Sequence, residues 1–408
     1  MKHEENVTAD RDIRIWRKAE MKWKRCLMAL TVVVSLACSS GAVFSATNLP
    51  EGNTQPRTFR MGFTPFAPDD TPEAVAQVTQ FIRANADIVA EHMESVPWSE
   101  ALNGSALPKN LMDNWHRRKE SLPAKAAVYL ALSPGRGALA DTWGATEHDP
   151  LPKDFQGKTF SDPMVEKAYL AYCKQAIEFF KPQFMAIGIE FNELIYNAPD
   201  KSAGYAELHR YVYQELKKSY PNLPIFASFT VHGLLDERHS KADRDRDLAY
   251  VKSLMPYNDL VGISYYPFFG NLSGRLDEVF TWLSATFDSY GKPYAVAETG
   301  EAAKNLTVQM DGKPWNILGS PEAQTIYYQK LFAFADSHHM AFIISFLCID
   351  YDALWKKIAS KNPAVFEAWE NNGFVDSRGE MRPAYKVWRQ WFDRPLVEER
   401  GTHGAVAR

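Results

Sequence analysis

Cysteine is scarce in this 408-residue sequence, and neither sign of charge is in clear excess. Of the four cysteines, only Cys173 and Cys348 lie beyond residue 46, so no disulfide framework is indicated and both thiols are expected to fill core positions. The 46 basic and 50 acidic residues give a formal net charge of −4, which provides no general attraction to nucleic acid or to an anionic membrane surface. We therefore expect stability to come from packing, and no nucleic-acid partner.

Motifs that hold metals or phosphate-containing cofactors are also missing. No His-Glu-x-x-His or Cys-x-x-Cys sequence occurs, and the aspartates do not gather into a set of metal ligands. No glycine-rich turn follows the first strand-like segment, as it would in a dinucleotide-binding fold. The sequence predicts no metal site and no cofactor.

The N-terminal segment has the layout of an export signal. Basic residues at 22–25 precede an apolar run at 26–37, which is shorter than the roughly 20 residues that a membrane-spanning helix needs. Small residues follow it. Cleavage after Ser45 or Ala46 fits a secretory signal peptide, whereas Cys38 fits a bacterial lipoprotein site at which the cysteine is lipidated and attaches the protein to a membrane. Either alternative predicts an exported protein.

The remaining organisation is simple. We expect an N-terminal extension and signal at 1–46, a polar linker at 47–57, one domain at 58–395 and a tail at 396–408, and we expect a monomer. The polar residues before Met21 leave open whether Met1 or Met21 is the true start.

Strand-like and helix-like patterns alternate through the domain. This alternation predicts a parallel sheet with helical crossovers. Polar or aromatic residues follow nearly every strand, which favours a closed (β/α)8 barrel, an α/β fold, over an open doubly wound sheet. The eight predicted strands begin near residues 59, 87, 126, 184, 224, 259, 294 and 341.

Two of these strands end in glutamate. The apolar segment 184–189 is followed by Glu190 and Glu193, and the segment that starts at Tyr294 closes with Glu298. In a (β/α)8 barrel the active site lies at the carboxyl ends of the strands, where two carboxylates can cleave a glycosidic bond. Strand alternation places Glu190 out of phase with Glu193, so Glu190 is expected to face away from the barrel axis. The alternating charges of 243–247 are interpreted as a solvated loop.

At this point the chain resembles the clan of retaining glycoside hydrolases built on (β/α)8 barrels. The likeness covers the fourth strand onward, and the segments 259–269 and 295–299 are similar to those of endo-β-1,4-galactanases. The resemblance implies that Glu193, in the pair Asn192-Glu193, is the general acid/base and that Glu298 is the nucleophile. It also implies that Asn192 binds the sugar 2-hydroxyl. One of the adjacent tyrosines, Tyr265 or Tyr266, would hydrogen-bond the nucleophile.

Further residues near strand ends are substrate-binding candidates. His92 and Glu94 share a strand face, where they either bind sugar hydroxyls or form a buried pair. Trp98 is a candidate for stacking on a sugar ring. His232 follows the fifth strand and is a third polar candidate.

The sequence therefore predicts an exported glycoside hydrolase that acts on a carbohydrate by a retaining double displacement. One alternative is a barrel that binds carbohydrate as an inactive scaffold. Another is a barrel enzyme of different chemistry, but no phosphate cradle, Schiff-base lysine or metal motif points to one.

Overall fold

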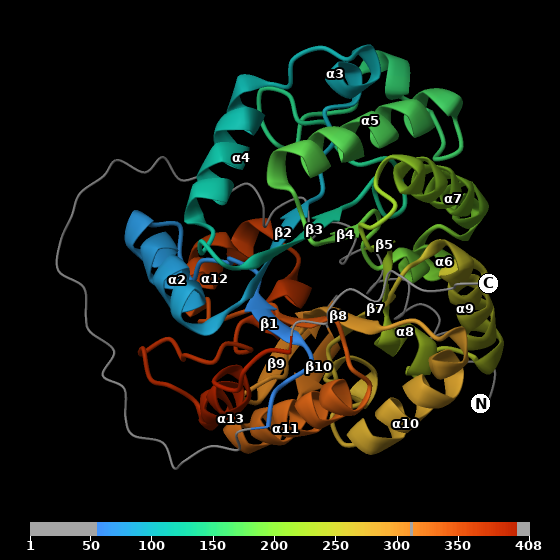
Figure 1. Cartoon of the computed structure of the whole chain (residues 1–408). Coiled ribbons are helices and arrows are strands. Elements are labelled where there is room, and N and C mark those ends of the chain that lie inside the picture. Colours follow the sequence, from blue (N-terminus) through green and yellow to red (C-terminus); the bar gives the residue numbers. More distant parts are fainter. Residues whose placement is uncertain (1–54, 311–312, 398–408) are drawn as a thin grey trace.

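The computed structural model describes residues 55–310 and 313–397, and its centre is a closed parallel β-barrel (Figure 1). The sheet runs in the order β5-β4-β3-β2-β1-β11-β8-β7-β6, and all its pairs are parallel. The segments β5 and β6 are separated only by Ala227, with β5 paired to β4 and β6 to β7, so one stretch of chain closes the ring. Counting them as one strand gives the predicted eight. The barrel strands are β1 (Arg60–Phe63), β2 (Ile88–Met93), β3 (Ala127–Leu132), β4 (Phe184–Ala186), β5 (Ile225–Phe226), β6 (Ser228–Thr230), β7 (Val261–Tyr265), β8 (Tyr294–Thr299) and β11 (Phe342–Ser345).

Helices surround the barrel, as Figure 1 shows, and most of them are crossovers between consecutive strands. The α-helices are α2 (Pro72–Asn85), α3 (Trp98–Asn103), α4 (Lys109–Ser121), α5 (Pro163–Phe180), α6 (Leu194–Asn197), α7 (Ser202–Ser219), α8 (Val231–Leu235), α9 (Lys241–Leu254), α10 (Leu276–Phe287), α11 (Pro321–Ser337), α12 (Asp352–Ile358) and α13 (Pro383–Phe392). Short 3-10 turns lie at Lys153–Phe155, Phe191–Glu193, Pro199–Lys201, Met255–Tyr257, Phe269–Asn271, Asp288–Tyr290, Ala359–Lys361 and Ala364–Trp369.

The starts of several helices follow from their capping residues. The side chains of Thr71, Asp162 and Ser320 each accept a hydrogen bond from a backbone N–H of the first turn, and each is followed by proline. Such a residue satisfies a donor that the helix leaves unpaired, and proline at the first position needs no partner. The predicted starts of α2 and α11 are confirmed.

Apolar side chains pack on both faces of the barrel sheet. Side chains facing the helices form the larger core, and a smaller set fills the inside of the barrel. Tyr129 is central in this inner set, with ring centroids 4.8 Å from Phe342 and 5.7 Å from Phe226. Filling this part of the barrel with apolar side chains leaves polar groups at the carboxyl ends of the strands. Cys173 and Cys348 are both buried and unbridged, as predicted.

Two parts of the chain differ from expectation. Residues 243–247, interpreted as a solvated loop, belong to helix α9, and Asp247 is fully buried because its carboxylate faces the end of β4. A hairpin of β9 (Leu306–Met310) and β10 (Lys313–Ile317) follows β8 and was not predicted.

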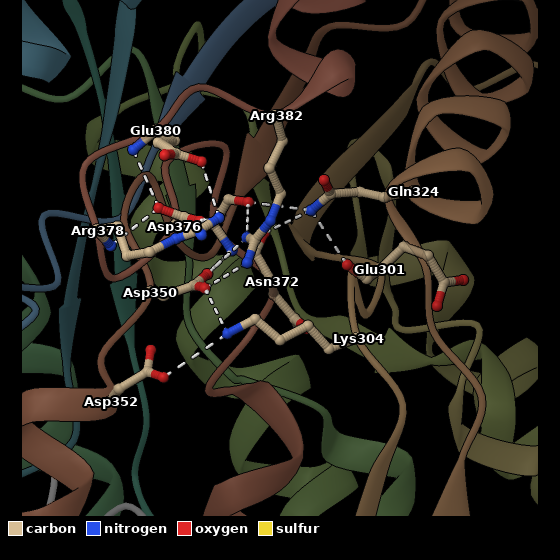
Figure 2. Close-up of polar contacts among 11 residues, drawn as sticks. Glu301, Lys304, Gln324, Asp350, Asp352, Asn372, Asp376, Arg378, Glu380 and Arg382 are labelled. Atoms are coloured by element: carbon tan, nitrogen blue, oxygen red, sulfur yellow. Dashed lines mark hydrogen bonds and ion pairs between the residues drawn. The ribbon is translucent and has the colours of Figure 1, made fainter.

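A polar network joins the last strand of the barrel to the C-terminal segment (Figure 2). Arg382, just before α13, donates two hydrogen bonds to Asp350, one of them 2.6 Å long, and a third to Gly373 O at 2.5 Å. Gln324 of α11 donates to carbonyls of Glu301, Asn372 and Gly373. The network ties the loops after β8 and β11 to the segment 372–382.

Some predictions fall outside these residues. The predicted signal segment, Cys38 and residues 398–408 lie outside the described part of the chain. Within residues 55–310 and 313–397, no helix has the length and apolar character needed to cross a membrane.

Candidate active site

A group of charged and polar side chains gathers at the carboxyl ends of the barrel strands. Most are buried, so their charges interact through a medium less polar than water. The group comprises His92 and Glu94 from the end of β2, Arg136 after β3, Glu190 and Glu193 after β4, His232 in α8, Ser264 and Tyr266 from the end of β7, and Glu298 in β8.

Glu298 is turned into this group by an irregularity in β8. The pairing of β7 with β8 shifts between Ile263, which faces Val296, and Ser264, which faces Glu298, so one extra residue stands in β8. The pairing with β11 shifts at the same place. A β-bulge of this kind redirects a side chain. The Glu298 carboxylate accepts a 2.6 Å hydrogen bond from Tyr266 Oη and lies 3.5 Å from His92 Nδ1.

The environment of Glu298 favours its protonated form. Burial and the charge of Glu190 raise its pKa to about 8, and the Tyr266 hydroxyl opposes this shift. Of the two adjacent tyrosines, Tyr266 therefore has the position that the resemblance implied.

Glu190 does not face away from the barrel axis, contrary to the prediction from strand alternation. The strand β4 ends at Ala186, and Glu190 has a left-handed backbone conformation with φ 52° and ψ 44°, so a period of two does not extend to it. Its carboxylate accepts a 2.6 Å hydrogen bond from Ser264 Oγ and one of 2.7 Å from Arg136 Nη1. Burial would raise its pKa, but Arg136 and Ser264 lower it overall.

Glu193 lies beside Glu190 and shares its cation. Arg136 Nη1 is 3.2 Å from the Glu193 carboxylate and 2.7 Å from that of Glu190, and Arg136 Nε is 3.7 Å from Glu94. Burial and the charge of Glu190 raise the pKa of Glu193 to about 8. The same two causes raise the pKa of Glu94 well above its usual range.

Arg136 is thus a central residue that the sequence did not reveal. It belongs to the segment after the third strand, and only its place after a barrel strand could have drawn notice. A single guanidinium contacts three carboxylates here, so these acids do not all ionise independently.

Asn192, assigned to the sugar by resemblance, has a different position. It is fully buried, its Nδ2 donates to Thr230 O at 3.1 Å and to Asp247 at 3.0 Å, and its Oδ1 accepts from Thr230 N at 2.8 Å. The amide connects the turn after β4 to β6 and α9. These bonds occupy the amide in the folded chain, and binding of substrate by Asn192 stays a prediction.

Two aromatic candidates also lie in the core. Tyr265 faces the helix layer, with ring centroids 5.9 Å from Tyr327 and 6.2 Å from Phe280, because strand alternation directs it opposite to Tyr266. Trp98 has no exposed surface and donates from Nε1 to Ala140 O at 2.9 Å. Of the two alternatives, Tyr266 rather than Tyr265 bonds Glu298, and the indole ring of Trp98 has no exposed face in this structure.

The two histidines of the group are neutral. Burial lowers the pKa of His92 and of His232 to about 4. His232 stacks on Phe269 with ring centroids 4.9 Å apart, and Phe269 in turn stacks on Trp315 of the hairpin at 5.3 Å. An aromatic wall therefore extends from Tyr266 and His232 to the half-buried Trp315. Aromatic faces of this kind suit sugar rings. Binding of sugar hydroxyls by His92, Glu94 and His232 stays a prediction.

Among the described residues, no group of three or more His, Cys, Asp or Glu side chains has the arrangement of a metal site. The arrangement instead offers carboxylates that hold and transfer protons, which is the chemistry of glycosidic bond cleavage.

No protein-family model matches this sequence, and no curated protein matches it. Solved structures do match the fold. Exo-β-1,4-mannosidase Op5Man5 from Opitutaceae bacterium strain TAV5 is 13% identical with a TM-score of 0.56, over 82% of this chain and 59% of that one. A GH5_18 protein from Streptomyces cattleya in complex with Manβ1-4GlcNAc is 14% identical with a TM-score of 0.55, over 84% and 83%. A structure of fungal β-1,4-galactanases is 16% identical with a TM-score of 0.50, over 81% and 94%.

This likeness establishes the (β/α)8 fold, the fold of these glycoside hydrolases. The chain spans 59% of the length of the mannosidase it matches.

Proposed function

We propose that the protein is a glycoside hydrolase that cleaves a β-linked oligo- or polysaccharide by a retaining double displacement. The observation that carries the proposal is Glu298, held by Tyr266 at the end of β8, in one buried group with Glu190 and Glu193 of the turn after β4. One carboxylate attacks the sugar carbon while another protonates the leaving oxygen. The tyrosine hydroxyl favours the ionised form of Glu298, as a nucleophile requires.

The sequence assigns the acid/base to Glu193. Its pKa of about 8 means that the two carboxyl groups of the turn after β4 hold a proton between them at neutral pH, as a proton donor requires. The solved structures similar in fold include a β-1,4-mannosidase and β-1,4-galactanases, so mannosides and galactosides are the first substrates to try. Arg136 is already engaged by three carboxylates, which disfavours an acidic sugar because a uronate would compete with them for the same guanidinium.

The test is hydrolysis of a panel of aryl β-glycosides and polysaccharides by the mature protein and by Glu298→Gln. Loss of the nucleophile should reduce turnover by about 1,000-fold or more, while NMR of the wild-type reaction should show the β-anomer as the first product.

Glu301→Gln is the matched control for this test. Glu301 is equally buried, also has a pKa raised to about 8 by burial, and bonds Ser273 rather than any residue of the site. It should retain activity. Retention of substantial activity by Glu298→Gln would refute the proposal, and glycan binding without turnover by the wild type would favour the scaffold alternative.

We also propose export of the protein, supported by the basic and apolar segments before residue 46. Mass spectrometry of the mature N-terminus separates the two alternatives. A lipid-modified Cys38 would place the protein on a membrane, and an N-terminus at residue 46 or 47 would mean free release.

A further inference from the structure

We propose that Glu190, rather than the Glu193 of the Asn-Glu motif, is the carboxyl group that donates the proton to the leaving oxygen, and that Glu193 positions Arg136. This inference rests on the proposed function and specifies its second catalytic residue. The motif points to Glu193, whereas the contacts of the folded chain point to Glu190.

The first observation is the connection between Glu190 and the strand beside Glu298. Ser264 of β7 is the register partner of Glu298 on β8, and neighbouring strands lie about 4.8 Å apart. The Ser264 hydroxyl donates to Glu190 at 2.6 Å. Glu190 therefore reaches from the end of β4 to the residue that stands directly beside the nucleophile.

The second observation is the reach of the Glu190 charge. It raises the pKa of Glu298 and acts on the pKa values of His92, His232 and Tyr266 as well. At Glu298, the charge of Glu190 makes the largest contribution after burial. Glu190 thus lies among all the groups that surround the nucleophile.

The third observation is the backbone. Glu190 has φ 52°, a left-handed conformation that residues with a β-carbon rarely adopt. Strain of this kind persists where the surrounding structure imposes it and is typical of functional positions. Ser228 Oγ contacts the Glu190 amide at 3.1 Å and holds the turn. The conformation is what brings the carboxylate into the barrel mouth.

Glu193 has a different environment. Its contact in the group is with Arg136 Nη1, at 3.2 Å, on the nitrogen that also bonds Glu190. Glu193 is the last residue of the short 3-10 turn Phe191–Glu193, in which Asn192 is held by hydrogen bonds to Thr230 and Asp247. A carboxyl group at this place holds the Arg136 guanidinium against Glu190 and exchanges protons with the Glu190 carboxyl group.

The proposed steps conserve protons and charge. The ionised Glu298 forms a bond to the anomeric carbon as the glycosidic C–O bond breaks, and the proton of Glu190 passes to the departing oxygen. Glu190, now ionised, then removes a proton from a water whose oxygen bonds the anomeric carbon as the Glu298–carbon bond breaks. Arg136 and Ser264 lower the pKa of Glu190, whereas the pKa of Glu193 is raised to about 8, so the proton rests on Glu193 before the reaction. It reaches the departing oxygen through Glu190, which shares Arg136 Nη1 with Glu193 and is reprotonated from it.

The experiment compares Glu190→Gln with Glu193→Gln, on a dinitrophenyl glycoside and on an alkyl glycoside of the same sugar. Dinitrophenolate leaves without protonation, so loss of the acid affects mainly the alkyl substrate. Glu190→Gln should lose about 100- to 10,000-fold in kcat/KM on the alkyl glycoside. On the dinitrophenyl glycoside it should accumulate a glycosyl-enzyme, seen by intact-protein mass spectrometry, and azide should restore turnover with a β-glycosyl azide as product.

Glu193→Gln should shift the pH profile and lower kcat/KM on both glycosides alike, without rescue by azide. Azide rescue confined to Glu193→Gln would overturn the inference and return the acid to the motif residue. The activities of the wild type and of Glu298→Gln are measured first. An inactive wild type overturns the proposed function and this inference together. Misassignment of the acid overturns the inference alone.

Ser264→Ala is a second variant in case Glu190→Gln does not fold. It removes a hydrogen bond that lowers the pKa of Glu190 without contacting Glu193. In the pH profile of kcat/KM, the limb that reports loss of the acid's proton should then move to higher pH. An unchanged limb would contradict the role of Glu190.

Discussion

Replacing Tyr266 by phenylalanine isolates one hydrogen bond at the proposed nucleophile. The Tyr266 hydroxyl donates to the Glu298 carboxylate at 2.6 Å, in a site where both side chains are buried. Hydrogen bonds to charged groups contribute about 1.5–3 kcal/mol. If the ionised carboxylate is the reactive form, Tyr266→Phe should lower kcat/KM at neutral pH by about 10- to 150-fold.

The pH dependence gives the direction of the effect. The pKa of Glu298 is already raised to about 8, and the tyrosine favours the ionised form, so removing the hydroxyl raises the pKa further. Activity requires the ionised form and therefore increases as pH rises through this pKa. In Tyr266→Phe the rising limb of kcat/KM should move to higher pH.

The assay is the pH profile of kcat/KM on an aryl glycoside, with thermal unfolding as the check on folding. Tyr265→Phe is the matched control, because Tyr265 is adjacent, equally buried, directed toward the helix layer, and its hydroxyl has no hydrogen-bond partner. Its profile should equal that of the wild type. An unshifted limb in Tyr266→Phe, or an equal loss in Tyr265→Phe, would refute the assignment of Glu298 as the nucleophile held by Tyr266.

Two further predictions concern stability. Asn192→Ala should lower the free energy of unfolding, measured by urea titration, by about 2–4 kcal/mol, because it leaves Thr230 and the buried Asp247 without their amide partner. A change below about 0.5 kcal/mol would contradict the structural role of Asn192. Burial raises the pKa of Glu301 from 4.5 to about 8. The stability that its bound proton contributes is therefore complete below pH 4.5 and is lost as pH rises through 8, by up to ~1.4 kcal/mol per pH unit. Glu301→Gln, which mimics the protonated form, should therefore unfold at a higher temperature than the wild type at pH 9 and at a similar one at pH 5, and equal differences at both pH values would exclude this linkage.

The barrel could be predicted from the sequence because its signal is spread over many residues. Eight apolar segments of strand length recur between helical patterns, and helix starts are marked by local capping residues such as Thr71 and Ser320. Each of these features depends on near neighbours in the chain. The outward direction of Tyr265 and the inward direction of Tyr266 follow from alternation, but the sequence alone does not say which of the two faces Glu298.

The site was predicted less completely because its side chains are placed by exceptions to regular structure. Glu298 depends on the bulge in β8 and Glu190 on a left-handed turn, and a period of two predicts neither. Arg136 comes from an irregular segment after β3, where spacing gives no direction to a side chain. The Asn-Glu motif drew attention to Glu193, yet its Asn192 bonds Thr230 and Asp247, a partner 55 residues away that had been interpreted as part of a solvated loop.

The electrostatics of the barrel mouth favour a catalytic over a purely binding role. Four glutamates, Glu94, Glu190, Glu193 and Glu298, are brought close to one another around a single guanidinium, and burial raises the pKa values of three of them. Carboxylates in such surroundings destabilise the folded state, since a buried charge without a full partner costs several kcal/mol. A barrel that only bound neutral sugars could hydrogen-bond the sugar hydroxyls with amides, which carry no charge to bury. A set of carboxyl groups that exchange protons near neutral pH is what acid/base chemistry requires, and no requirement of folding explains it.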